Sequence, residues 1–329
     1  MTRLSQSHRS SPPAAPRRAL WVHAGALGDF VLALRVADAL HQSGFAGVTI
    51  LGRPGIAGMA LGCYGIDEIL DVECGGYHPL FSADPIPADH CLRRFIDRFD
   101  LIVDMLGATA LTGRALSARP RAIIRIDPRP EEAGLGHVTD PWMKCLVDAG
   151  LTGSARAPRI AVSADARRRA RARLVSVLPV QRASIILIHP GSGGAAKCWP
   201  IGRFVSLARE LATRGHGVIF IIGDVERARW GLDRMAALRS AAPVIEPAGA
   251  VELRDALAAA ELYVGNDSGA SHLAAAVAAP TVAVFGPTDP RRWRPLGEHV
   301  TVVRRGAASW PSVDEVLEAA HRRLLALCP

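Results

Sequence analysis

The clearest indication of the fold class is the segment "ELYVGNDSGASHLAAAVAAPTVAVFGP", residues 261–287. It begins with a short apolar run, breaks into polar residues and glycines, and continues as an alanine-rich segment that Pro280 stops. A second apolar run follows at once. A strand, a helix and another apolar strand in this order are typical of a βαβ unit, whose two strands lie parallel in one sheet. The stretch therefore predicts a parallel α/β sheet with a polar glycine loop where a strand enters a helix.

The same alternation extends through the rest of the chain. "RALWVHAGALGD", residues 18–29, and "ASIILIHPGSGG", residues 183–194, share one layout: an apolar strand, a histidine and a glycine loop. The alternation pauses at residues 152–169, "TGSARAPRIAVSADARRR", which suits a hinge. We therefore expect two Rossmann-like domains. The expected ranges are a disordered tail at 1–18, an N-terminal domain at 19–160, a C-terminal domain at 161–310 and a final helix at 311–329 with Ser312 and Glu315 as its capping box.

Composition narrows the class of protein. The 329 residues are 49% hydrophobic and 21% charged, which is typical of a globular chain, and no apolar run reaches the roughly 18 residues that a membrane helix needs. The six cysteines include no Cys-x-x-Cys pair, so neither a disulfide framework nor a zinc site is indicated. The net charge is +8, and the densest arginine run is "DARRRARARL", residues 165–174. Without interleaved aromatic residues it indicates a solvated helix face rather than nucleic-acid binding, with attraction to an anionic membrane as a second option.

The first glycine loop, "HAGALGDF", places Asp29 at the start of a helix. Its glycines, Gly25 and Gly28, do not form the Gly-x-Gly-x-x-Gly fingerprint of dinucleotide sites. Asp29 can be an ordinary first-turn acid, which the helix dipole favours. It can also be a general base that faces a cleft between the domains. This loop alone favours the first interpretation.

The second loop, "HPGSGGAAKCWP", combines three glycines with Ser192 and Lys197 just before a helix. Glycines let the backbone approach a ligand, and Lys197 adds a positive charge beside the positive end of the helix. The spacing is not that of a Walker motif. A surface lysine beside a structural Trp-Pro turn is the alternative, and the combination favours an anion site.

The third loop lies inside the opening stretch. Its glycines and helix N-terminus again suit an anion, whereas Asp267 would repel a diphosphate and fits sugar hydroxyls better. His272 can donate a hydrogen bond to a phosphate or a leaving oxygen, or it can be a satisfied first-turn histidine. Thr288 and Asp289, after the last strand, form either a plain turn or a rim of the same pocket. The chain has no Asp-x-Asp, His-Glu-x-x-His or Gly-x-Ser-x-Gly motif, so we expect no metal site and no nucleophile elbow.

Three segments together resemble glycosyltransferase family nine, the ADP-heptose:lipopolysaccharide heptosyltransferase family. They are "GALGDFVLAL", "HPGSGGAAKCWPIGRF" and "VGNDSGASHLAAAVAAPTVAVFGPTDPRRWRP", and with their connecting strands and helices the resemblance spans nearly all of 19–329. It implies an α/β GT-B fold, in which two Rossmann-like domains face a central cleft. It also implies inverting, metal-independent transfer from a nucleotide sugar, without a cofactor. The first domain would hold the acceptor and the second the nucleotide sugar, and the final helix would cross back onto the first domain.

The resemblance also implies roles for individual residues. Asp29 matches the proposed base, Lys197 the lysine that binds the donor diphosphate, and Glu226 an acid near the nucleoside. The expected catalytic residues are Asp29, Lys197 and His272, and the acceptor-side loop contains Gly25, Gly28 and Asp29. The expected donor-binding residues are Ser192, Gly193, Lys197, Glu226, Asp267, Ser268, Gly269, Ala270, Ser271 and His272.

The expected donor is therefore ADP-heptose or a similar nucleotide sugar, and the expected acceptor is a lipopolysaccharide-core or other lipid-linked saccharide. Two alternatives remain open: a nucleotide-sugar-binding protein without transfer activity, and a sugar-nucleotide epimerase on the same fold. We expect a cytoplasmic monomer that binds no nucleic acid, with peripheral contact with the inner membrane as a further option.

Overall fold

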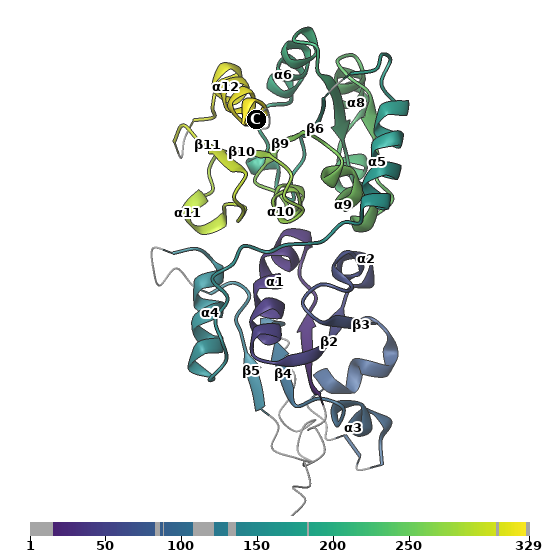
Figure 1. The fold of residues 1–329 in the computed structure, drawn as a ribbon, viewed down its shortest axis with the longest axis vertical. Coiled ribbons are helices and arrows are strands. Elements are labelled where there is room, and N and C mark those ends of the chain that lie inside the picture. The colour runs from purple at the N-terminus through teal and green to yellow at the C-terminus, as the bar shows by residue number, and fades with distance from the viewer. Residues whose placement is uncertain are drawn as a thin grey trace, which may run out of the picture.

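Two parallel sheets, each covered by helices, make up the chain (Figure 1). The computed structural model describes residues 16–82, 86–87, 89–107, 122–130, 136–182, 184–306 and 309–326. The expected N-terminal tail lies almost wholly outside these residues. All strand pairs between described residues are parallel, as the alternating pattern predicts.

The first sheet has the strand order β3-β2-β1-β4-β5. In its centre, Trp21 of β1 pairs with Ile50 of β2 on one side and with Val103 of β4 on the other. Its strands are β1 (Arg17–His23), β2 (Phe45–Gly52), β3 (Ile66–Asp71), β4 (Leu101–Asp104) and β5 (Ala122–Arg125). Its helical segments are α1 (Leu27–Gln42), α2 (Pro54–Ala57), η1 (Gly58–Ala60), η2 (Gly75–Phe81), α3 (Cys91–Ile96) and α4 (Thr139–Asp148).

The second sheet has the order β11-β10-β9-β6-β7-β8, with β9 and β6 at its centre. Its strands are β6 (Ile185–His189), β7 (Gly217–Ile221), β8 (Val244–Ile245), β9 (Leu262–Asn266), β10 (Thr281–Val284) and β11 (Val300–Val303). Its helical segments are α5 (Ala164–Ser176), η5 (Ala195–Lys197), α6 (Ile201–Thr213), α7 (Asp224–Arg229), α8 (Leu232–Arg239), α9 (Ala250–Ala258), α10 (Gly269–Ala276), α11 (Pro290–Trp293) and α12 (Val313–Leu325).

The central strands are continuous apolar runs because helices cover both faces of each sheet. Every residue of β6, β9 and β10 is buried. In α6, Phe204, Val205, Ala208 and Leu211 are buried on one stripe, as the helical periodicity predicts. The loops after β1, β6 and β9 lie at the junction of the two domains, where their residues Gly28, Ser192 and Gly269 line one cavity.

Helices α1 and α10 pack against each other across this junction (Figure 1). Their N-termini approach so closely that a Cβ atom on Gly269 would lie 2.9 Å from the backbone nitrogen of Gly28 and 2.9 Å from Cβ of Leu27. Only glycine permits this approach. Apolar side chains of both helices belong to one continuous core cluster, so the junction is a packed contact.

The final helix corrects one expectation. α12 begins at the predicted capping box, in which the Glu315 amide donates to the Ser312 hydroxyl and the Ser312 amide donates to the Glu315 carboxylate. It does not cross back to the first domain. Its buried residues Val316, Leu317 and Ala320 pack in the core of the second domain, over α6 and β10 (Figure 1). The amphipathic stripe therefore predicted a buried face correctly, but the prediction that this face packs on the first domain was wrong.

The arginine-rich run forms α5, and part of it is bonded to its own domain. Arg167 Nη1 donates to the Ala258 carbonyl at 2.9 Å, at the C-terminal end of α9, where a positive charge is favourable. Arg171 pairs with Glu261 at 2.6 Å. Part of the face that was expected to be solvated thus forms hydrogen bonds and an ion pair that join α5 to the end of α9 and the residues after it.

Candidate functional site

A cavity of about 550 Å³ lies between the two domains and brings the three glycine loops together. It is bounded by the N-terminus of α1, the loop after β6, the N-terminus of α10 and the loop after β10. Its charged and titratable lining residues are Asp29, Arg129, Lys197, Asp267 and His272. Loops beyond the carboxyl ends of parallel strands are where open α/β sheets bind ligands.

Asp29 is the third residue of α1 and faces this cavity from the first domain. Ala26, the residue before the helix, has no side chain that could cap it, so the first-turn acid stands at an uncapped helix start. The Asp29 side chain is 26% exposed, and its Oδ2 lies 3.3 Å from Nη2 of Arg129. Asp29 is thus a carboxylate with access to the cavity and one exposed arginine as its partner.

Lys197 and Asp267 face each other across the same cavity. The Lys197 ammonium lies 2.9 Å from Asp267 Oδ2, and the two side chains are 38% and 5% exposed. The Ser192 hydroxyl donates to the Asp267 carbonyl at 2.8 Å and so ties the second loop to the third. Asp267 is thus fixed by the loops, and Lys197 is the more accessible partner of the pair.

The N-terminus of α10 presents free amides and a buried imidazole. Among the described residues, the amides of Ser268, Gly269 and Ala270 have no hydrogen-bond partner, whereas the Asp267 amide donates to Val284. His272 is buried and lines the cavity, and its Nδ1 has no partner in the described part of the chain. Burial lowers the pKa of His272 to about 4, so the ring is neutral near pH 7.

Glu226 lies in a neighbouring cavity of about 300 Å³, which shares Ser192 with the first. Its Oε2 accepts from the Gly223 amide at 2.9 Å and lies 3.6 Å from His189 Nε2. Burial alone would raise the pKa of Glu226, but the His189 contact and the amide hydrogen bonds hold it below the ordinary value. The adjacent Gly191 has no room for a side chain, because a Cβ atom would lie 1.9 Å from Glu226 Oε1.

Some predicted residues do not reach the first cavity. Ser271 is fully buried, and its hydroxyl bonds to the Asn266 carbonyl and to the Tyr263 hydroxyl. Ala270 is buried as well and is not part of the lining, so only its amide is available. The Gly25 amide bonds to His23 Nδ1 at 3.3 Å, and Gly25 stands beside the cavity without lining it. Gly28, Gly193, Ser268 and Gly269 do line it.

Several residues of the site could not be predicted from local motifs. Arg129 lines the cavity but comes from a segment without a ligand-binding signature. Thr288 and Trp293 also line it, and they follow the last strand of the quoted segment, where a pocket rim was one of the two interpretations of Thr288. Asn266, at the end of β9, forms hydrogen bonds with both ends of the loop after β6. Its Nδ2 donates to the Pro190 carbonyl at 2.8 Å, and its Oδ1 accepts from the Trp199 amide at 2.9 Å. A buried polar residue at a strand end was the available signal for Asn266.

The chain is similar to proteins of known family and to solved structures. The model of glycosyltransferase family 9 (heptosyltransferase) matches residues 101–320, which is two thirds of the chain. Lipopolysaccharide heptosyltransferase 2 of Salmonella typhimurium is 36% identical over 116 residues, which cover 34% of this chain and 33% of that protein. The matched segment thus spans about a third of this curated relative.

Solved structures resemble nearly the whole chain. The family 9 glycosyl transferase from Veillonella parvula superposes with a TM-score of 0.72 at 17% identity, covering 94% of this chain and 97% of that one. E. coli ADP-heptose lps heptosyltransferase II gives a TM-score of 0.70 at 19% identity, covering 94% and 99%. The two-domain architecture is therefore the GT-B fold that the sequence predicts.

Proposed function

The chain belongs to glycosyltransferase family 9, and from that premise we propose that it transfers heptose or a related sugar from a nucleotide diphosphate donor to a saccharide acceptor. The observation that carries this proposal is the cavity in which Asp29 of one domain faces Lys197, His272 and the free amides of α10 in the other. The preferred donor is ADP-heptose, which the name of the similar E. coli enzyme contains. The preferred acceptor is a lipopolysaccharide-core saccharide, after the name of the Salmonella relative.

The donor diphosphate would lie at the N-terminus of α10. Amides without partners and the positive end of the helix dipole attract phosphate oxygens. Lys197 is 38% exposed and can turn from Asp267 toward a phosphate, which leaves the Asp267 carboxylate free to accept hydrogen bonds from sugar hydroxyls. Glu226 and the neighbouring cavity would take the nucleoside, since Ser192 joins the two spaces.

Asp29 would act as the base in an inverting transfer. It accepts the proton of the acceptor hydroxyl while the acceptor oxygen forms a bond to the anomeric carbon. The bond between that carbon and the phosphate oxygen breaks, and its electron pair leaves with the nucleoside diphosphate. The amides of α10 and Lys197 stabilise the charge that grows on the leaving group. Because His272 is neutral, it contributes a hydrogen bond rather than a full charge.

Replacement of Asp29 by asparagine tests this assignment. The variant keeps the size of the side chain but cannot take up the proton, so we expect normal stabilisation by ADP in a thermal-shift assay and loss of transfer by a factor of about 100 or more. Transfer is measured by mass spectrometry with ADP-heptose and a heptose-deficient core acceptor. An active Asp29→Asn enzyme would show that the base is a different group. Donor conversion without acceptor would indicate an epimerase, and ADP binding by a wild-type chain that never transfers would indicate a binding protein.

We also propose peripheral contact with an anionic membrane, at which a lipid-linked acceptor would lie. Among the described residues no helix combines the length and the apolar character needed to cross a bilayer. The support is the +8 net charge, since each basic residue near an anionic surface contributes about 1 kcal/mol. Co-sedimentation with phosphatidylglycerol vesicles, but not with phosphatidylcholine vesicles, is the expected result, and equal recovery with both lipids would refute it.

A further inference from the structure

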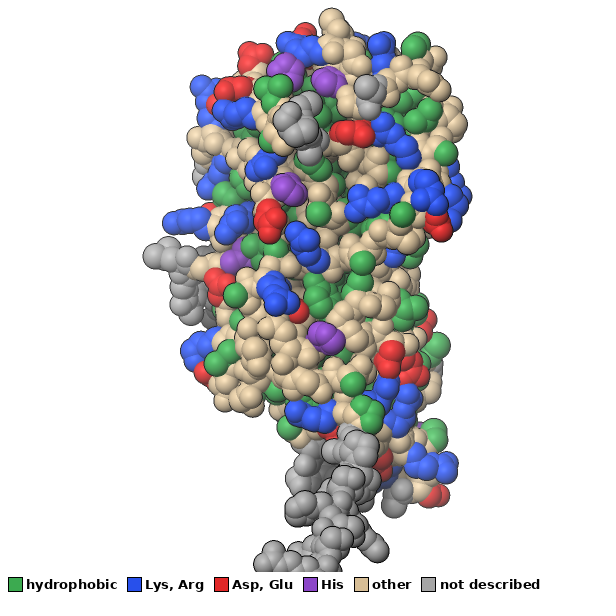
Figure 2. All heavy atoms as spheres, viewed as in Figure 1, with side chains coloured by type: hydrophobic (Ala, Val, Ile, Leu, Met, Phe, Trp, Pro, Cys, Tyr) green, Lys and Arg blue, Asp and Glu red, His purple; other side chains and the backbone are tan. Residues whose placement is uncertain are grey.

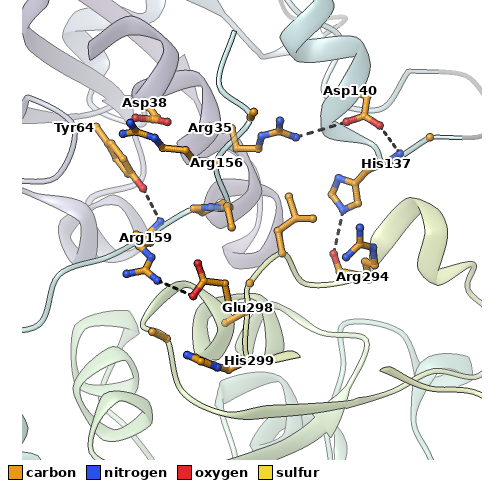
Figure 3. Close-up of a pocket in the computed structure, with 18 of the residues that line it drawn as sticks. Arg35, Asp38, Tyr64, His137, Asp140, Arg156, Arg159, Arg294, Glu298 and His299 are labelled. Carbon is orange, nitrogen blue, oxygen red and sulfur yellow. Dashed lines mark hydrogen bonds and ion pairs between the residues drawn. The ribbon is translucent and has the colours of Figure 1, made fainter. Parts of the chain in front are cut away.

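A second, larger cavity lies at the junction of the two domains and takes no part in the proposed transfer. Its volume is about 930 Å³, and it shares no lining residue with the cavity at Asp29. The first domain contributes Arg35 and Asp38 of α1, the linker contributes residues 155–159, and the second domain contributes residues 296–299 (Figure 3). Helices α1 and α10 run between the two cavities, because Asp29 and His272 line one and Arg35 and Ala275 line the other.

Part of the lining is already bonded within the protein. Arg35 donates to the Thr139 hydroxyl and lies 3.6 Å from Asp140, and these bonds fasten α1 to α4. His137 Nε2 contacts the Arg294 carbonyl at 3.0 Å, which joins the first domain to the second (Figure 3). These contacts form the fixed wall of the cavity.

Other basic side chains of the lining have no partner among the described residues. The guanidinium groups of Arg156, in the linker, and Arg294, in the second domain, make no hydrogen bond or ion pair with any residue that the structure describes. The same holds for the imidazole of His299 within the described ranges. Both arginines are exposed. Figure 2 shows basic, histidine and acidic side chains intermixed on one face of the molecule. These groups are free to bind a ligand.

The charge of the lining is positive. Five arginines contribute to it, namely Arg35, Arg156, Arg159, Arg291 and Arg294, against the three carboxylates Asp38, Asp140 and Glu298. Arg159 reaches Glu298 only at 3.6 Å, and Arg291 is bonded to Asp289. A guanidinium presents its N–H groups as a planar fork that matches the oxygens of a phosphate. A cavity of this volume accommodates a small-molecule ligand.

We propose that this junction cavity binds a phosphorylated small molecule, held between Arg156 of the linker and Arg294 of the second domain. The ligand would contact both domains and the segment that joins them. It therefore favours the domain arrangement in which the two arginines face the same space, since a ligand shifts an equilibrium toward the state that it binds better. This binding does not depend on sugar transfer.

Titration calorimetry of the full chain with inorganic pyrophosphate tests the proposal. The Lys197→Ala variant serves as the background, because it removes the lysine of the other candidate anion site. We expect Arg156→Ala/Arg294→Ala in this background to weaken pyrophosphate binding by at least tenfold. A matched control, Arg168→Ala/Arg322→Ala, removes the same charge from exposed positions on α5 and α12 and should bind as the background does.

Two results would overturn the proposal: unchanged binding in the Arg156→Ala/Arg294→Ala protein, or an equal loss in the control, which would show an effect of net charge alone. Titrations with ADP and with glucose 1-phosphate distinguish the two sources of the phosphate. If only ADP binds, and its binding is lost in the Arg156→Ala/Arg294→Ala protein, the ligand is a nucleotide. If only glucose 1-phosphate behaves in this way, the ligand is a sugar phosphate. Small-angle scattering should show a more compact chain with pyrophosphate, and no change in size would refute the bridging role.

Discussion

Replacement of Gly269 by alanine perturbs the contact between the two domains at one point. The new Cβ atom would lie 2.9 Å from the Gly28 nitrogen and 2.9 Å from Leu27 Cβ, closer than real Cβ atoms approach other atoms. The Gly28 nitrogen is part of the backbone of α1, so no side-chain rotation can relieve the clash. Both neighbours belong to the other domain, so the strain disappears when the domains separate.

The free-energy cost of this clash can be derived from the contact distances. Overpacking a well-packed contact costs about 1–3 kcal/mol. The gain from replacing glycine by alanine in a helix is about 0.5–1 kcal/mol, but it is the same whether or not the domains touch. The clash alone therefore disfavours the arrangement in which the two domains touch by about 1–3 kcal/mol. This is roughly a 5- to 150-fold change in the equilibrium between touching and separated domains.

Small-angle scattering and transfer assays measure the outcome. Gly269→Ala should have a larger radius of gyration than the wild-type chain and a transfer rate lower by roughly tenfold, with ADP binding retained. Gly202→Ala is the matched control, because no atom outside its own helix lies within 4 Å of the Cβ that it would add on α6. If Gly269→Ala gives the scattering curve of Gly202→Ala, the helix N-termini do not determine how the domains meet.

Three further perturbations address the second domain. Gly191→Ala should lower the free energy of unfolding by about 2 kcal/mol or more in urea titrations, because the new methyl group displaces the buried Glu226 carboxylate; a stable variant would contradict the contact. Ser312→Ala removes the cap of α12 and should cost about 1 kcal/mol in the same titration, whereas an exposed-site variant such as Ser206→Ala should cost less. The pKa of His272 is about 4 in the folded chain, against an ordinary value of 6.5. Between these two values the unfolded chain takes up a proton that the folded chain excludes, so the free energy of unfolding should fall by up to about 3 kcal/mol as the pH falls from 6.5 to 4. His272→Gln should flatten this part of the curve, and an equally steep curve would mean that other groups cause the loss.

The sequence predicted those elements whose signal is local. β6, β9 and β10 are apolar runs of strand length, and α6 carries a regular buried stripe, so their positions followed from periodicity. The short edge strand β8 has two residues and too few side chains to show any period. α12 shows the limit most clearly, because an amphipathic stripe specifies that one face is buried but not which domain covers it.

The candidate site divides in the same way. Lys197 and His272 belong to loops whose composition indicates an anion site, and the structure brings them to one cavity together with Gly28 of the first glycine loop. Arg129 reaches Asp29 from 100 residues along the chain, so no local pattern could pair them. Ser271 has the right residue type and position for a ligand, but its hydroxyl is turned toward the Asn266 carbonyl because α10 packs against β9 on that side.

Because α12 stays with the second domain, the described chain passes from one domain to the other only once, between α4 and α5. A single connection constrains torsion between the domains less than two would, so their orientation depends on contacts across the junction such as that of α1 with α10. It also makes the chain divisible. A cut at the exposed Arg156 would leave each sheet with its own helices. We expect the two halves, produced separately, to reassociate through the packed contact of α1 with α10.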